Sequence, residues 1–156
     1  MITSRRDYLL RLIEEVGRAL ARITTLRSSH RELDALQSVV SACERLFGME
    51  ADKLFQLSPS EHFAMLTENE LSEPARERVL LYAALNHEAG LAYKALNNPD
   101  MARASFTNAL RFARLARIAY GTEDEPDFAP DETTLLEQLK GAPLDDDLVE
   151  LLRTPT

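Results

Sequence analysis

The three histidines are the residues of this 156-residue chain best suited to acid–base or metal chemistry. The stretch HEAGL, which begins at His87, starts like the zinc-protease pattern, in which two histidines four positions apart bind the metal from one helical face. Position 91 is Leu, so the second ligand is missing. His30 and His62 lie far from this pair in the sequence and have no metal-ligand partners at helical spacing. We therefore predict no metal site and no cofactor.

Other catalytic patterns are also missing from the sequence. It contains no glycine-rich phosphate loop, no Gly-x-Ser-x-Gly turn and no Cys-x-x-Cys pair. The acidic run Asp145–Asp147 lacks the spaced ligands and central glycine of a calcium loop, so we interpret it as a solvated helix start. We predict no catalytic residues and a protein that is not an enzyme. An enzyme whose site is assembled from dispersed residues is the less favoured alternative.

Length and composition bound the class of protein. A chain with 45% hydrophobic and 28% charged residues fits one compact domain over residues 1–156. No apolar run approaches the roughly 20 residues that cross a bilayer, and the start, MITSRRDYLL, lacks the apolar core of a signal peptide. Cys43 lies on the apolar side of a predicted helix, so we expect a buried, inert thiol. These features predict a cytoplasmic protein without membrane contact.

Hydrophobic periodicity predicts an all-α chain, because apolar residues recur at three- and four-residue steps and no segment alternates like a strand. The predicted helices cover about residues 4–26, 30–47, 50–57, 59–67, 72–96, 99–120, 133–140 and 145–153. Capping-box patterns at Ser29–Glu32 and Ser58–Glu61 predict two of the helix starts. Gly17 and Gly90 fall inside helical patterns, where glycine costs about 1 kcal/mol relative to Ala, so both indicate close packing.

Charge divides the chain unevenly. We distinguish N-terminal helices over residues 1–71, a helical hairpin over 72–120 and an acidic C-terminal segment over 121–156. The last segment holds two basic and eleven acidic residues, a net charge of −9, whereas the chain as a whole carries −8. This balance argues against nucleic-acid binding.

A basic face on the helix after Pro99 is the counterpart of that acidic segment. Its four arginines fall within about 120° of arc at roughly 100° per residue; they are Arg103, Arg111, Arg114 and Arg117. One interpretation is an ordinary solvated face. The sharper hypothesis is that the acidic segment folds back onto the arginines and covers the hairpin.

The hairpin itself combines small and large residues in a definite order. Gly90 and Tyr93 lie on its first arm, and Ala102, Phe106 and Ala109 lie on its second arm. Small residues allow two helices to approach closely, and the aromatic residues fill the neighbouring space. Over residues 83–117 this pattern resembles one tetratricopeptide repeat. The opening RRDYLLRLIEEVGRALARI is also similar to a family of functionally uncharacterised bacterial helical proteins.

The tetratricopeptide resemblance implies both a fold and a binding surface. The implied fold is a set of antiparallel helical hairpins, a fragment of a right-handed α-solenoid with extra N- and C-terminal helices. In such arrays the first helix of each pair lines a peptide-binding groove, and the matching positions here are Ala84, His87, Leu91 and Lys94. His87 and Lys94 would then hold a carboxylate or a carbonyl. The alternative is that another helix of the same chain covers Leu91.

Two functions follow from these patterns. The first is a non-catalytic protein–protein interaction module, a scaffold or adaptor of the tetratricopeptide type, whose protein partner the sequence does not identify. The second is a self-assembling structural subunit, a homodimer formed through the apolar stripe of the N-terminal helix, which includes Leu9 and Ile13. The sequence leaves both open.

Overall fold

The structure, a computed structural model, describes residues 2–68 and 73–156, with side chains from residue 5 onward. Every regular element in these ranges is a helix, so the predicted all-α class is confirmed for the described residues. The helices are α1 (Ile2–Ser28), α2 (Glu32–Phe47), α3 (Ala51–Leu54), α4 (Pro59–Thr67), α5 (Glu73–Ala95), α6 (Pro99–Tyr120), α7 (Glu132–Gln138) and α8 (Asp146–Arg153). The predicted start of the fifth helix at Ser72 lies outside the described residues.

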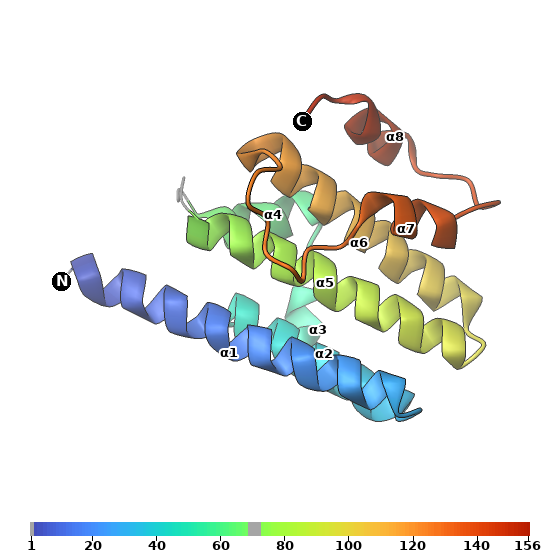
Figure 1. The fold of residues 1–156 in the computed structure, drawn as a ribbon, viewed down its shortest axis with the longest axis horizontal. Helices are drawn as coiled ribbons and strands as arrows, with labels where there is room; N and C mark the ends of the chain where they lie inside the picture. Colours follow the sequence, from blue (N-terminus) through green and yellow to red (C-terminus); the bar gives the residue numbers. More distant parts are fainter. Residues whose placement is uncertain (1, 69–72) are drawn as a thin grey trace.

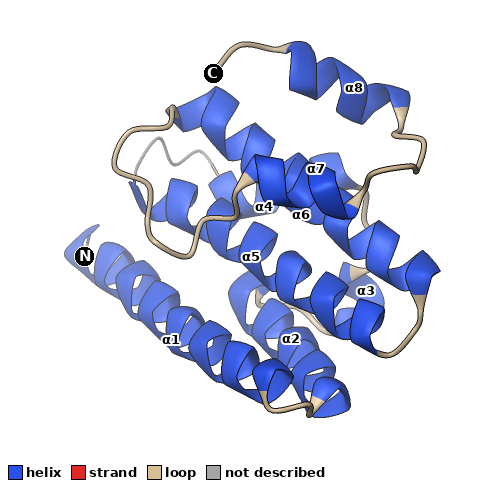
Figure 2. Ribbon diagram, turned by 45° about the vertical axis from the view of Figure 1, so that its right-hand side comes forward, coloured by secondary structure: helices blue, strands red, loops and turns tan. Residues whose placement is uncertain are grey.

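Two long helical hairpins form the body of the molecule. The first pairs α1 with α2, and the second pairs α5 with α6. Helix α5 is the central element, because it contacts α1, α2, α4 and α6. The short helices α7 and α8 pack on α6, at the end of the molecule away from α1 and α2 (Figures 1 and 2).

The two predicted capping boxes have different outcomes. At α4, the Ser58 hydroxyl accepts from the Glu61 N–H and the Glu61 carboxylate accepts from the Ser58 N–H, as predicted. At α2, the prediction is wrong, because the N-cap is Arg31 and no side chain caps the helix. The physical reason is that α1 continues to Ser28, so the Ser29 N–H bonds the Thr25 carbonyl and Ser29 belongs to the preceding turn.

The main core lies between the two hairpins. The apolar stripe of α1 is buried there, and its members are exposed by 7% or less: Leu9, Leu12, Ile13, Val16, Leu20 and Ile23. Helices α2 and α5 are the elements packed against α1. The stripe is therefore occupied within the chain itself. The argument that this stripe exposes a dimerisation surface at Leu9 and Ile13 does not hold.

A second, smaller core joins α6 to the C-terminal helices. Its buried members come from both sides of this contact: Ala102, Phe106, Ala109, Leu110, Leu135, Leu139 and Leu148. Leu91 and Tyr93 of α5 pack at its edge. The acidic segment is therefore attached to α6 through apolar packing as well as through charge.

The two glycines inside helices have opposite surroundings. A Cβ atom built on Gly90 would lie 2.5 Å from Cε1 of Phe106, so α5 and α6 approach closely only because this position has no side chain. This is the contact that the size order of the hairpin predicts. At Gly17 the prediction of close packing is wrong, because nothing lies within 4 Å of the equivalent atom.

Candidate functional site

The four residues predicted to line a peptide groove do not face open solvent together. Ala84 is only 4% exposed, and His87 is half-buried with its ring centroid 6.1 Å from that of Phe106. Leu91 packs at the edge of the second core, and the Lys94 ammonium donates to Oε1 of Gln138 on α7 at 2.8 Å. For Leu91, the alternative of a cover formed by the chain's own helices is the one observed.

The chemistry suggested by the His87-Glu88 pair is also absent from this site. The Glu88 carboxylate accepts from the Thr24 hydroxyl at 3.0 Å and from the Arg27 guanidinium, so it fastens α5 to α1. Burial lowers the pKa of His87, which favours its neutral form. Among the described residues, no group of three His, Cys, Asp or Glu side chains is arranged to hold a metal ion.

Three of the four arginines on the predicted basic face are neutralised by the acidic segment. Arg111 contacts Asp145 at 3.2 Å, and Arg114 contacts Glu132 at 3.1 Å. Arg114 also donates to the carbonyl oxygens of Leu151, Leu152 and Thr154, in the last turn of α8 and just beyond it. For these arginines the hypothesis that the segment folds back is confirmed.

Arg117 has the most extensive set of these contacts. It pairs with Glu125 at 2.8 Å and with Glu132 at 2.9 Å, and it donates to the Pro130 carbonyl. Arg103 does not share this arrangement, because it pairs with Asp100 of its own helix at 4.0 Å. The chain near Arg103 is the end of α7 and the following turn, which place Gln138 and Lys140 there instead of carboxylates.

An apolar groove lies on the other flank of α6. We define the apolar groove as the cavity of about 450 Å³ between α2, α5 and α6, whose lining also includes residues of the α3–α4 region. It is lined by Leu36, Val39, Val40, Cys43, Phe55, Leu57, Pro59, His62, Tyr82, Asn86, Ala89, Tyr93, Met101, Ala104, Ser105 and Asn108. None of these sixteen residues is Asp, Glu, Lys or Arg.

A cluster of aromatic rings makes the floor of the apolar groove rigid. The ring of Tyr82 meets Phe47 at 4.9 Å and Phe112 at 4.8 Å between centroids, both edge to face. His62 is 5% exposed, and its Nε2–H donates to the Leu54 carbonyl at 2.7 Å. Cys43 is 2% exposed, and burial raises the pKa of its thiol to about 12. The Cys43 thiol is therefore inert, as predicted.

The rim of the apolar groove exposes large hydrophobic side chains. Val40 is 37%, Phe55 53% and Met101 44% exposed. Isolated exposed apolar residues are ordinary, but these three border one cavity. The sequence does carry a signal for part of this surface, because Leu36 and Val40 on the apolar side of α2 both line the groove.

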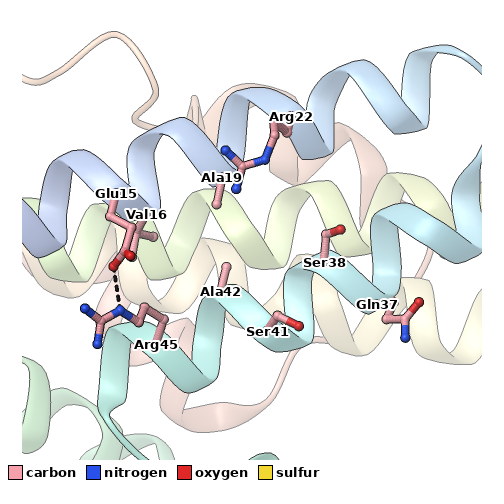
Figure 3. Close-up of a pocket in the computed structure, with 9 residues that line it drawn as sticks. All are labelled: Glu15, Val16, Ala19, Arg22, Gln37, Ser38, Ser41, Ala42 and Arg45. Atoms are coloured by element: carbon pink, nitrogen blue, oxygen red, sulfur yellow. Dashed lines mark hydrogen bonds and ion pairs between the residues drawn. The ribbon is translucent and has the colours of Figure 1, made fainter.

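A second depression, the α1–α2 trough, lies between the first two helices. Its volume is about 370 Å³, and its residues, shown in Figure 3, are Glu15, Val16, Ala19, Arg22, Gln37, Ser38, Ser41, Ala42 and Arg45. The Arg45 guanidinium donates to Glu15 across it at 2.5 Å. Its two serines have no histidine beside them in the lining, so the trough offers no activated nucleophile.

Comparison with known proteins adds no relative. No protein-family model matches the chain, and no curated protein or solved structure matches it either. Among the described helices, none is both long enough and apolar enough to cross a membrane. The functional argument therefore proceeds from the geometry of the apolar groove.

Proposed function

We propose that this protein is a non-catalytic protein–protein interaction module and that the apolar groove is its binding surface. The observation that carries the proposal is the gathering of Val40, Phe55 and Met101, each more than a third exposed, around a cavity with no charged lining. Burying the exposed part of each side chain would stabilise a complex by on the order of 1 kcal/mol. Contiguous apolar surface of this kind is typical of an interaction site.

The occupant that fits the apolar groove best is the apolar face of a partner helix. The walls of the groove are helices, whose backbone N–H and C=O groups are already bonded internally, so they offer no edge for strand addition. Recognition must then come from side-chain packing, as when an amphipathic helix lies in a groove. Because the lining holds no charged residue, the polar face of that helix would remain in water.

The hairpin arrangement supports a scaffold or adaptor of the tetratricopeptide type. Helix α5 contacts both α1 and α2, as the first helix of one repeat contacts both helices of the repeat before it. The missing side chain at Gly90 allows Phe106 to approach, in agreement with the small–large order of that repeat. In this proposal α1–α2 and α5–α6 act as two consecutive hairpins, and α7–α8 close one end of the array.

Site-specific photo-cross-linking tests the proposal directly. A photoreactive phenylalanine analogue at position 55 or 101 lies on the rim of the apolar groove, and the same analogue at position 136 provides a control. Leu136 is 40% exposed and lies outside the groove lining. We expect adducts in the native cell from positions 55 and 101, lost when Val40→Asp is added, and none from position 136.

The mass of the adduct separates the two functions that the sequence left open. A partner of different mass supports the interaction module, whereas an adduct of twice the chain mass would identify a self-assembling homodimer that uses the apolar groove. Equal yields from positions 55 and 136, or yields unaffected by Val40→Asp, would show that the groove is not the binding surface.

A further inference from the structure

A small cationic cavity lies at the tip of the α5–α6 hairpin, independent of the apolar groove. We define the cationic cavity as the space of about 250 Å³ lined by Lys94, Pro99, Ala102, Arg103, Phe106, Gln138, Lys140, Gly141 and Ala142. At 100° per residue, its α6 members are about 160° around the helix from those of the apolar groove. The two surfaces therefore occupy opposite flanks of α6.

Three cations line this cavity, and no acidic residue does. Lys94 donates to the neutral amide of Gln138. Arg103 approaches Asp100 at 4.0 Å and Lys140 approaches Glu137 at 4.0 Å, and in both pairs the side chains are more than half exposed. Such long, solvated ion pairs contribute little to the stability of the folded protein.

The contrast with the rest of α6 makes the positive charge of this cavity informative. In a chain of net charge −8, Arg111, Arg114 and Arg117 are each matched by carboxylates of the acidic segment. The same segment brings Lys140 next to Arg103, which adds a positive charge where a negative one would neutralise the arginine. The cations of the cavity therefore have only the long pairs to Asp100 and Glu137, and they can still bind an external anion.

We propose that the cationic cavity binds a phosphate monoester. The exposed carboxylates of Asp100 and Glu137 balance the three positive charges only in part. A phosphate monoester carries about −1.5 to −2 at pH 7 and presents three acceptor oxygens. Arg103 supplies a planar guanidinium suited to two of these oxygens, and the lysines supply point charges.

The remaining lining indicates what the phosphate is attached to. Pro99, Ala102, Phe106 and Ala142 are apolar and offer contact to a compact apolar or aromatic body beside the charged groups. The cavity is too small for a nucleotide-sized ligand to be enclosed, since pockets for larger ligands span about 300–1,000 Å³. The ligand is therefore a small phosphate monoester or a phosphorylated side chain of another protein.

Titrations followed by amide NMR test this site with defined probes. Phenyl phosphate, inorganic phosphate, N-acetylphosphoserine amide and benzoate would be added separately to the full chain. We expect saturable shifts confined to residues around Lys94, Arg103 and Gly141 with the phosphates, and at least about tenfold weaker binding of the singly charged benzoate. Tighter binding of phenyl phosphate points to a small molecule, and tighter binding of the phosphoserine compound points to a phosphorylated protein.

A matched pair of variants separates a built site from general charge attraction. The triple variant K94Q, R103Q, K140Q removes the three cations, and R6Q, R11Q, R18Q removes three exposed cations of α1 with the same change in net charge. We expect at least about tenfold weaker phenyl phosphate binding in the first variant and less than about twofold change in the second. Similar losses in both, or no saturable shifts in the unmodified chain, would overturn the proposal.

Discussion

The two flanks of α6 differ in how the chain covers them. On one flank α7, α8 and the loop between α6 and α7 bury apolar residues and neutralise three arginines. On the other flank the apolar groove stays open, although its rim exposes Val40, Phe55 and Met101. One flank of α6 is thus covered by the chain itself, and the other leaves apolar side chains exposed to solvent.

The difference shows that apolar character alone does not decide where the chain folds back. The covered flank offers arginines, so the acidic segment gains ion pairs and hydrogen bonds there in addition to apolar packing. The open flank offers no charge, and the same segment would have to leave its carboxylates unpaired. We infer that charge selects the flank and that hydrophobic burial stabilises the docked segment.

The largest expected effect comes from breaking the apolar part of the covered flank. Leu135 on α7 is fully buried in the second core, so Leu135→Ala should destabilise the protein by about 2–5 kcal/mol. Its neighbour Leu136 is 40% exposed, and Leu136→Ala should stay within about 0.5 kcal/mol. Urea unfolding of both variants measures the difference. Equal, small effects would mean that α7 does not pack as described.

The ion pairs of the covered flank should contribute somewhat less to the free energy of unfolding. Arg117→Met removes the contacts to Glu125 and Glu132 and leaves the Pro130 carbonyl without this donor, which we expect to cost about 2–3 kcal/mol. Arg103→Met removes only a long pair and should cost less than about 0.5 kcal/mol. Chemical denaturation at low and high salt provides the comparison. If the two substitutions cost the same, the selection of the flank by charge is refuted.

A smaller effect, but one with opposite signs at two sites, is expected from adding one methyl group to α5 or α1. Gly90→Ala places Cβ against the buried Phe106 ring and should destabilise by about 1–3 kcal/mol. Gly17→Ala meets open space in a helix and should stabilise by up to about 1 kcal/mol. Thermal unfolding measures the sign of the stability change in each variant. A stabilising Gly90→Ala would show that α5 and α6 are not in close contact there.

These glycines also show what the sequence can predict. Periodicity and turn residues predicted that the helices exist but not all of their ends, as the cap of α2 shows. The spacing of Gly90 and Phe106 predicted their contact, because both residues belong to one hairpin joined by a short turn. Gly17 gave the same local signal, but its surroundings depend on which helix covers that side of α1. Local sequence does not contain that information.

For the candidate site, too, the sequence predicts local features but not those that depend on the packing of distant segments. The charge difference between the body and residues 121–156 motivated the hypothesis that the C-terminal segment docks on the arginines, but it left an ordinary solvated face as the other interpretation. The apolar groove was missed because its lining comes from several separate segments, and only their packing shows that Val40, Phe55 and Met101 border one cavity. The residues proposed from the tetratricopeptide resemblance lie on the flank that the chain itself covers, as Leu91 and Lys94 show.

The last prediction concerns the floor of the apolar groove. The pH dependence of stability at Cys43 tests whether water reaches the residues beneath the exposed rim. Burial raises the pKa of this thiol from 9.0 to about 12, so the folded state holds the proton that the unfolded chain releases. The thiol's contribution to stability is therefore fully present below pH 9 and is lost as the pH rises from 9 toward 12. At pH 10 the expected loss is about 1.4 kcal/mol.

Comparing the slope of unfolding free energy against pH in the unmodified chain and in Cys43→Ala isolates this contribution. Burial also raises the pKa of Tyr82, which acts in the same direction above pH 10, but that group is present in both proteins. The substitution changes stability at every pH by a constant amount through lost packing, so only the slope between pH 8 and 10 is diagnostic. Parallel curves would mean that water reaches the thiol, and the apolar groove would then extend deeper than its rim and floor indicate. A flatter curve for Cys43→Ala would establish a dry floor beneath an open surface, the condition under which an apolar partner side chain gains most from binding there.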